Sequence, residues 1–266
     1  WTQKANFIGA SRSFGVGFSL GTNGYIGLGN GGQDFWKWDQ STNIWSAIAN
    51  FPGTPRTGAF AWSIGTKGYV GTGSSGGQEL WEYDPSLDSW TPKANFPGLA
   101  IYWTAYFSIG TKGYVGTGYD GVNRQDFWEW DQSTNTWAQK ANFATARRAA
   151  VGFSIGPVGY IGLGYDSNYA TDWWEYNPTS NNWTQVANFG GPASCCHVTY
   201  TIGNFAYVVT GYEMATGVSQ MNWEFAPLGT AVTENNNEVT VSVYPNPFTE
   251  TLNINSPANG ELKIFD

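Results

Sequence analysis

The stretch W-S-A-I-A-N-F, Trp45–Phe51, is one of five copies of the phrase W-x-x-x-A-N-F in this chain of 266 residues. The other copies are Trp1–Phe7, Trp90–Phe96, Trp137–Phe143 and Trp183–Phe189. Successive tryptophans are separated by a nearly constant interval of about 45 residues, a period typical of proteins in which one supersecondary unit is copied along the chain. The repeat therefore decides the fold.

Three further strand-like segments lie between successive copies of this phrase. In the second repeat they are Trp62–Gly65, Gly68–Gly73 and the residues around Trp81, and the other repeats keep the same order. Short runs with alternating aromatic residues, separated by Gly, Asn and Asp, predict antiparallel strands joined by hairpins. Each repeat is thus predicted to be a four-stranded meander. Alone, it could not bury both aromatic faces, and packing of neighbouring units around an axis would bury them.

The repeats carry a set of motifs that resembles the kelch repeat. An arginine precedes the first strand in three copies: Arg12, Arg56 and Arg147. The element Y-D/N-P-x-x-x-x-W is intact at Tyr83–Trp90 and Tyr176–Trp183, and glycines end the second strand of each repeat. The chain departs from the family where Gly27 and Gly29 split the usual glycine pair, and where Ile101 and Ser194 replace the arginine. The resemblance covers residues 1–227 and implies an all-β kelch-like β-propeller, with each repeat as one blade.

The strand count predicts how the propeller closes. The first W-x-x-x-A-N-F precedes the first complete repeat, and none follows the last third-strand segment, Asn222–Ala226. We therefore expect five blades, with Trp1–Phe7 pairing with Asn222–Ala226 to complete the last one. Such pairing would remove the exposed edges of an open array.

The repeat ends at Pro227, and residues 228–238 read as a polar, Asn-rich linker. Residues 239–266 contain Y-P-N-P-F followed by L-N-I: the motif residues are Tyr244, Pro245, Asn246, Pro247 and Phe248. This stretch resembles the opening of the type A C-terminal sorting domain of the Bacteroidota type IX secretion system. The resemblance implies export by that machinery to the cell surface or the extracellular space. We expect a short, truncated β-sandwich segment here; the alternative is an incomplete β-module without a special role.

Composition excludes some classes of partner. The formal net charge is −8 with a single histidine, whereas nucleic-acid binding needs a basic surface, so no nucleic-acid partner is expected. No apolar run approaches the roughly 18–20 residues that span a bilayer, so we expect no transmembrane segment. The chain shows no signal peptide, and we expect a mature, processed form. The adjacent Cys195 and Cys196 are read as small core residues, in preference to a redox pair.

The repeat also serves as its own control in the search for catalytic residues. A carboxylate opens the third strand in four repeats, at Asp34, Glu79, Asp126 and Asp172, so these side chains are predicted to be structural. Some kelch-like propellers are copper radical oxidases, which need two histidine ligands; this chain has only His197, read as a buried, hydrogen-bonded histidine. We therefore expect no enzyme, cofactor or transition-metal site. The sequence leaves open whether the protein binds calcium.

Residue types that differ between repeats concentrate in two sets of loops: those between the second and third strands, and those between the fourth strand and the next first strand. In an antiparallel meander both sets emerge at the same end, so one face is predicted to be variable. The predicted ligand-binding residues on that face are Tyr102, Trp103, Tyr119, Asp120, Arg124, Tyr165, Asp166, Tyr169, Tyr212 and Arg147. For the arginines, the alternative is hydrogen bonding to blade carbonyls.

Exposed aromatic rings beside carboxylates and guanidinium groups suit sugar rings, which stack on aromatic faces. The leading hypothesis is therefore a non-enzymatic, glycan-binding module of the cell surface or extracellular space. The same residue types dominate protein–protein hot spots, so the alternative is a structural or protein-interaction subunit of a surface assembly. A polysaccharide-active enzyme with an unrecognised site is a further alternative.

Overall fold

The protein is described from a computed structural model of the chain. The structure describes residues 2–30, 32–75, 77–213 and 217–227, and all their regular secondary structure is β-strand. The linker and sorting segment predicted at residues 228–266 lie outside the described residues.

Four sheets are four-stranded antiparallel meanders, one for each of the first four repeats. Blade 1 consists of β1 (Val16–Leu20), β2 (Asn23–Gly27), β3 (Phe35–Asp39) and β4 (Ile44–Ile48). Blade 2 consists of β5 (Phe60–Ile64), β6 (Lys67–Gly71), β7 (Leu80–Asp84) and β8 (Ser89–Lys93). Blade 3 consists of β9 (Ala105–Ile109), β10 (Lys112–Gly116), β11 (Phe127–Asp131) and β12 (Thr136–Gln139). Blade 4 consists of β13 (Val151–Ile155), β14 (Val158–Gly162), β15 (Trp173–Asn177) and β16 (Asn182–Val186).

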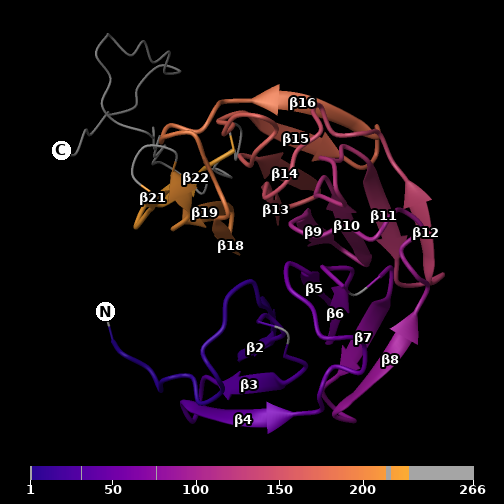
Figure 1. Cartoon of the computed structure of the whole chain (residues 1–266), viewed down its shortest axis with the longest axis vertical. Helices are drawn as coiled ribbons and strands as arrows, with labels where there is room; N and C mark the ends of the chain where they lie inside the picture. Colours follow the sequence, from indigo (N-terminus) through magenta and orange to yellow (C-terminus); the bar gives the residue numbers. More distant parts are fainter. Residues whose placement is uncertain (1, 31, 76, 214–216, 228–266) are drawn as a thin grey trace, which may run out of the picture.

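The fifth repeat forms two smaller sheets among the described residues. Blade 5 consists of β18 (Val198–Ile202), β19 (Phe205–Val209) and β22 (Asn222–Phe225). A separate three-stranded sheet contains β17 (Ser194–Cys195), β20 (Tyr212–Glu213) and β21 (Gly217–Val218). Figure 1 shows the blades arranged around a common axis, with the first strand of each blade innermost. The four-stranded meander predicted for each repeat is thus confirmed in blades 1 to 4.

Neighbouring blades pack an aromatic ring of one blade onto a glycine of the next. A Cβ atom at Gly113 would lie 2.7 Å from Nε1 of Trp62, and closer still to two other ring atoms of that tryptophan. Phe18 covers Gly68 and Phe107 covers Gly159 in the same way. Glycine is needed at this point of the second strand because any side chain would occupy the space of the neighbouring ring.

The phrase W-x-x-x-A-N-F ties each outer strand to the next blade. Trp90 Nε1 donates to the carbonyl of Ala49 at 2.9 Å, and the Ala49 amide donates to Asp88 Oδ1 at 2.9 Å. Phe51 packs edge-on against Trp90, with ring centroids 5.4 Å apart, and Arg56 lies over its face. The conserved spacing within the phrase therefore follows from one repeated contact between blades.

Residues 2–7 make this same contact with blade 1. Trp45 Nε1 donates to the carbonyl of Ala5 at 3.1 Å, and Phe7 packs edge-on against Trp45 at 5.1 Å. The pairing predicted between Trp1–Phe7 and Asn222–Ala226 is not formed among the described residues, because β22 lies at the far end of an arc that is open between blade 5 and blade 1 (Figure 1). Residues 2–7 therefore contact blade 1, which follows them in the chain. They do not pair with β22, the strand beside which they were expected to lie in blade 5.

A chain of backbone hydrogen bonds runs from blade to blade close to the axis. The amide of Gly58 donates to Phe14 O at 3.0 Å, that of Trp103 to Gly58 O at 3.0 Å, that of Ala149 to Trp103 O at 2.8 Å, and that of Cys196 to Ala149 O at 3.2 Å. All five residues have φ in the left-handed region. This chain of hydrogen bonds ends at Phe14, which precedes β1 of blade 1, and at Cys196, which precedes β18 of blade 5.

Candidate functional site

The two variable sets of loops lie on one face, as the sequence predicted, because they pair directly with each other. Tyr102 bridges to Tyr119 in blade 3, and Arg148 bridges to Tyr165 in blade 4. In blade 5 the same relation is extended, since β17 pairs with β20 and β20 with β21. We call this end of the molecule the variable face.

Six aromatic side chains form two groups of contacting rings on the variable face, from blade 3 to blade 5, and Arg148 lies between the groups. We call these six side chains the aromatic arc: Trp103, Tyr102, Tyr119, Tyr165, Tyr169 and Tyr212. Ring centroids of Tyr102 lie 4.8 Å from Trp103 and 5.7 Å from Tyr119. Tyr169 lies 5.3 Å from Tyr165 and 6.2 Å from Tyr212. All six rings are partly or fully exposed, so the structure brings together the aromatic residues predicted for a ligand site.

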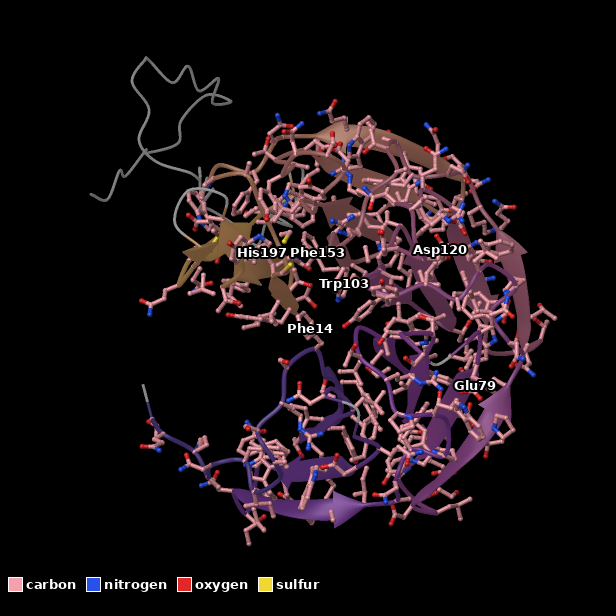
Figure 2. All side chains as sticks on the ribbon, in the orientation of Figure 1. Phe14, Glu79, Trp103, Asp120, Phe153 and His197 are labelled. Carbon is pink, nitrogen blue, oxygen red and sulfur yellow. The ribbon has the colours of Figure 1, made fainter. Side chains whose placement is uncertain are left out.

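A pocket of about 430 Å³ opens beside one end of the aromatic arc. Tyr102, Tyr119 and Asp120 form its wall in blade 3, and Ser74 and Ser75 form the facing wall in blade 2. The pocket therefore joins aromatic surface to hydroxyl and backbone groups. A second, larger cavity of about 950 Å³ follows the axis between the inner strands. In Figure 2, Phe14, Trp103, Phe153 and His197 lie towards the axis, whereas Asp120 lies further out.

Asp120 and Arg124 form a closed pair at the edge of this pocket. Arg124 donates through Nε to Asp120 Oδ1 at 2.9 Å and through Nη2 to Asp120 Oδ2 at 2.6 Å. These hydrogen bonds hold the pKa of Asp120 below its usual range. The charges of Asp120 and Arg124 therefore mainly pair with each other and stabilise the loop that contains both residues. Asp166, the matching residue of blade 4, is exposed and accepts a hydrogen bond from the amide of Asn168 at 3.1 Å.

Arg147 does not reach the variable face, although the sequence placed it among the ligand-binding residues. Its side chain is buried, with the residue only 1% exposed, and it donates to the carbonyl of Leu163 at 3.0 Å and to both carboxylate oxygens of Asp172. Arg56 makes the equivalent bonds to the carbonyl of Thr72 and to Glu79. Arg56 and Arg147 therefore donate to blade carbonyls, which is the alternative that the sequence offered for the arginines.

Arg148, the next residue, lies on the variable face and was not among the predicted site residues. Its guanidinium carbon is 4.9 Å from the ring centroid of Tyr119 and 4.6 Å from that of Tyr165. It thus joins the two halves of the aromatic arc. The repeat contained the signal that would have found it: Arg147 matches the arginine of other blades, whereas Arg148 has no counterpart in them.

The carboxylates that open the third strand are structural, as predicted from their repetition. Asp34, Glu79 and Asp172 each pair with the arginine of their own blade. Asp126 belongs to the blade in which Ile101 replaces that arginine, and it accepts a hydrogen bond from Trp128 Nε1 at 2.7 Å.

His197 is a buried histidine whose two ring nitrogens both have partners. Nδ1 lies 2.6 Å from the carbonyl of Thr210, and Nε2 lies 2.8 Å from Ser194 Oγ. Because a carbonyl can only accept, Nδ1 carries the proton. Burial lowers the pKa of His197. This arrangement agrees with the sequence prediction of a hydrogen-bonded core histidine.

The two cysteines differ from each other, which corrects the prediction that both fill the core. Cys195 is buried, whereas Cys196 is exposed, and both are free thiols. Their hydrogen bond lowers the pKa of Cys196, and the nearby charge of Arg148 adds to that effect. Within the part of the chain that the structure describes, no group of three or more His, Cys, Asp or Glu side chains is placed to hold a metal ion.

Comparison with known proteins agrees with the fold. No known family model matches the chain, and no curated protein matches it. A solved structure of YjhT is similar, with a TM-score of 0.66 and 20% sequence identity over 76% of this chain and 73% of that chain. No described segment forms a helix that is long and apolar enough to cross a membrane. The four-stranded antiparallel sheets and this structural likeness together show that the chain has a β-propeller fold.

Proposed function

We propose that this protein is a non-enzymatic, glycan-binding module that uses the variable face of its propeller. The aromatic arc is the observation that carries this proposal. Sugar rings present faces of C–H groups that stack on tyrosine and tryptophan, and their hydroxyl groups need nearby donors and acceptors. The pocket beside Tyr102 and Tyr119 supplies both kinds of contact, with Ser74 and Ser75 opposite the rings.

A second candidate function is docking of a surface protein on the same face. Tyr, Trp and Arg are the residue types that dominate protein–protein hot spots. The hairpin of β20 and β21 favours this reading, because Val218 is 85% exposed beside the exposed Tyr212. In this case the contact would centre on blade 5, whereas a glycan would centre on the pocket of blade 3.

A glycan array followed by calorimetric titration of the best ligand tests the proposal. Replacing Tyr119 or Tyr165 with Ala should weaken binding by roughly 1–3 kcal/mol, since each substitution removes a stacking surface. The matched controls are Thr66→Ala and Thr111→Ala, in the turns at the opposite end of blades 2 and 3, which should leave the affinity unchanged. If glycan binding weakened in the threonine variants but not in the tyrosine variants, the binding site would lie on the face opposite the variable face, and the proposal would be wrong.

We also propose that the chain is exported by type IX secretion to the outer cell surface or extracellular space. This proposal rests on the resemblance of Tyr244–Phe248 and the following L-N-I to a sorting domain. Replacing Tyr244–Phe248 by a Gly/Ser stretch in the precursor should stop export and leave the melting temperature of the propeller unchanged. Normal secretion of that variant from its own host would contradict the proposal.

For the fold, we propose that five blades close into one ring, with blade 5 against blade 1. Three features support this. Tyr200 occupies the position of the rings that cover glycines in other blades, yet it is 42% exposed. Gly24 occupies the position of those glycines, and a Cβ there would meet only Trp38, at 4.0 Å. The backbone hydrogen-bond chain has Phe14 N and Cys196 O as its two free ends among the described residues, and one more bond between them would complete it.

A further inference from the structure

Arg148 differs from the other four arginines of the chain because it has no ion-pair partner among the described residues. The others each have an ion-pair partner: Arg12 with Asp34, Arg56 with Glu79, Arg124 with Asp120, and Arg147 with Asp172. Arg148 forms no ion pair with any residue that the structure describes. In a protein whose formal net charge is −8, an arginine held without a carboxylate is a local exception.

The side chain is nevertheless held in one place. The guanidinium carbon lies over the rings of both Tyr119 and Tyr165, at 4.9 and 4.6 Å from their centroids. Nη1 donates to Asn123 Oδ1 at 3.1 Å, and Asn123 is itself fixed by a hydrogen bond from Nδ2 to the carbonyl of Asp166 at 3.1 Å. The position of Arg148 is therefore set by neighbours that leave its charge uncompensated.

Its remaining donors are open to solvent. A guanidinium has five N–H groups, and only the bond to Asn123 is formed by the side chain of Arg148 among the described residues. Buried nitrogens without a partner occur in Arg12, Trp62 and Trp81 but not in Arg148. The guanidinium carbon lies over both tyrosine rings, and the N–H groups that they leave exposed remain available to a partner. A carboxylate can accept two parallel hydrogen bonds from such a fork of N–H groups.

We infer that the ligand of the aromatic arc is an acidic glycan, whose hexuronate carboxylate is bound by the exposed N–H groups of Arg148 while neighbouring sugar rings contact Tyr119 and Tyr165. This inference rests on the proposed function and names its ligand class. A neutral sugar could accept hydrogen bonds from the guanidinium through its hydroxyl groups, but it would bring no opposite charge. The overall negative charge of the protein gives no general attraction to acidic polymers, so recognition has to come from this local group.

The test is calorimetric titration of the whole chain with paired probes: oligogalacturonate and oligoglucuronate, each beside its carboxyl-reduced neutral counterpart. The wild-type protein should bind at least one acidic probe roughly 10-fold or more tightly than its neutral partner, as hydrogen bonds to a charged group imply. Arg148→Gln should bring both members of that pair to similar affinity. Arg148→Lys keeps the charge but lacks the planar fork, so it should recover only part of the preference. Lys37→Gln, which removes one positive charge from β3 in blade 1, should keep the full preference.

The outcomes separate this inference from the proposed function. Equal binding of acidic and neutral probes by the wild-type protein would overturn the inference and leave glycan binding intact. An acidic preference that persists in Arg148→Gln would also overturn it, because another group would then be the carboxylate partner. Binding of neither class would overturn both. If Arg148→Gln melts early, the comparison of Arg148→Lys with the wild-type protein, together with the paired probes on the wild-type protein, still decides the question.

Discussion

Gly113 and Gly24 occupy the same place in two blades, and comparing their substitution by Ala tests how the propeller closes. At Gly113 the new methyl group would lie within 2.7 Å of three ring atoms of Trp62. That ring cannot easily move, because Trp62 is buried and stacks on Phe60 with a centroid distance of 4.4 Å. Overpacking of this kind costs typically about 1–3 kcal/mol. For a protein of this size the expected fall in melting temperature is about 2–12 °C.

At Gly24 the outcome depends on whether blade 5 packs against blade 1. In the open arc the methyl group would meet only Trp38, at 4.0 Å, and Gly24 is not among the glycines with positive φ. Gly24→Ala would then be neutral, or stabilising by about 0.4–1 kcal/mol through the smaller conformational entropy of the unfolded chain. In the closed ring Tyr200 would cover Gly24 as Trp62 covers Gly113, and the substitution would be destabilising.

Differential scanning calorimetry of the two variants and the wild-type protein decides the matter. The proposed closure predicts that Gly24→Ala and Gly113→Ala both lower the melting temperature. A loss in Gly113→Ala alone would refute closure between blades 5 and 1. No loss in either variant would refute the argument that these glycines are required by the ring of the neighbouring blade.

Three further substitutions test the internal chemistry of the blades. Arg56→Met should lower the free energy of unfolding by about 1–3 kcal/mol in urea titrations, because the buried carbonyl of Thr72 loses its donor; a change below 0.5 kcal/mol would contradict a structural role. Trp90→Phe should cost about 0.5–1.5 kcal/mol by the same measurement, since it removes the hydrogen bond to Ala49 and keeps an aromatic ring. The pKa of His197 is lowered by burial, so the unfolded chain takes up a proton first as pH falls through 6.5, and thermal stability should decline towards pH 5. Because this is the single histidine of the chain, His197→Gln should flatten that decline, and an unchanged slope would assign it to other groups.

Much of the fold and part of the candidate site followed from the repeat. Alternating aromatic residues, glycine turns and a constant interval predicted a four-stranded meander, because these signals act between residues close together in the chain. The same reasoning placed the variable loops at one end, and it brought Tyr102, Tyr119 and Tyr165 to one surface. The pairing of Tyr102 with Tyr119 confirms that placement. These features depend on local geometry and on the direction of successive strands.

Other features depended on contacts between segments far apart in the chain. Arg147 and Arg148 are adjacent, yet one is buried against Asp172 and the other lies between two tyrosines, because neighbouring residues in extended backbone point to opposite sides. Cys195 and Cys196 also divide into one buried and one exposed side chain, at a point where Cys196 has φ in the left-handed region. The motif of residues 2–7 predicts an outer strand, but these residues form no strand in the structure, because whether they meet a strand edge depends on how far the arc of blades turns. The sequence by itself determined the unit and its order; the tertiary structure decided which of two neighbouring side chains lies on the variable face and where the ends of the arc lie, since both depend on packing between blades.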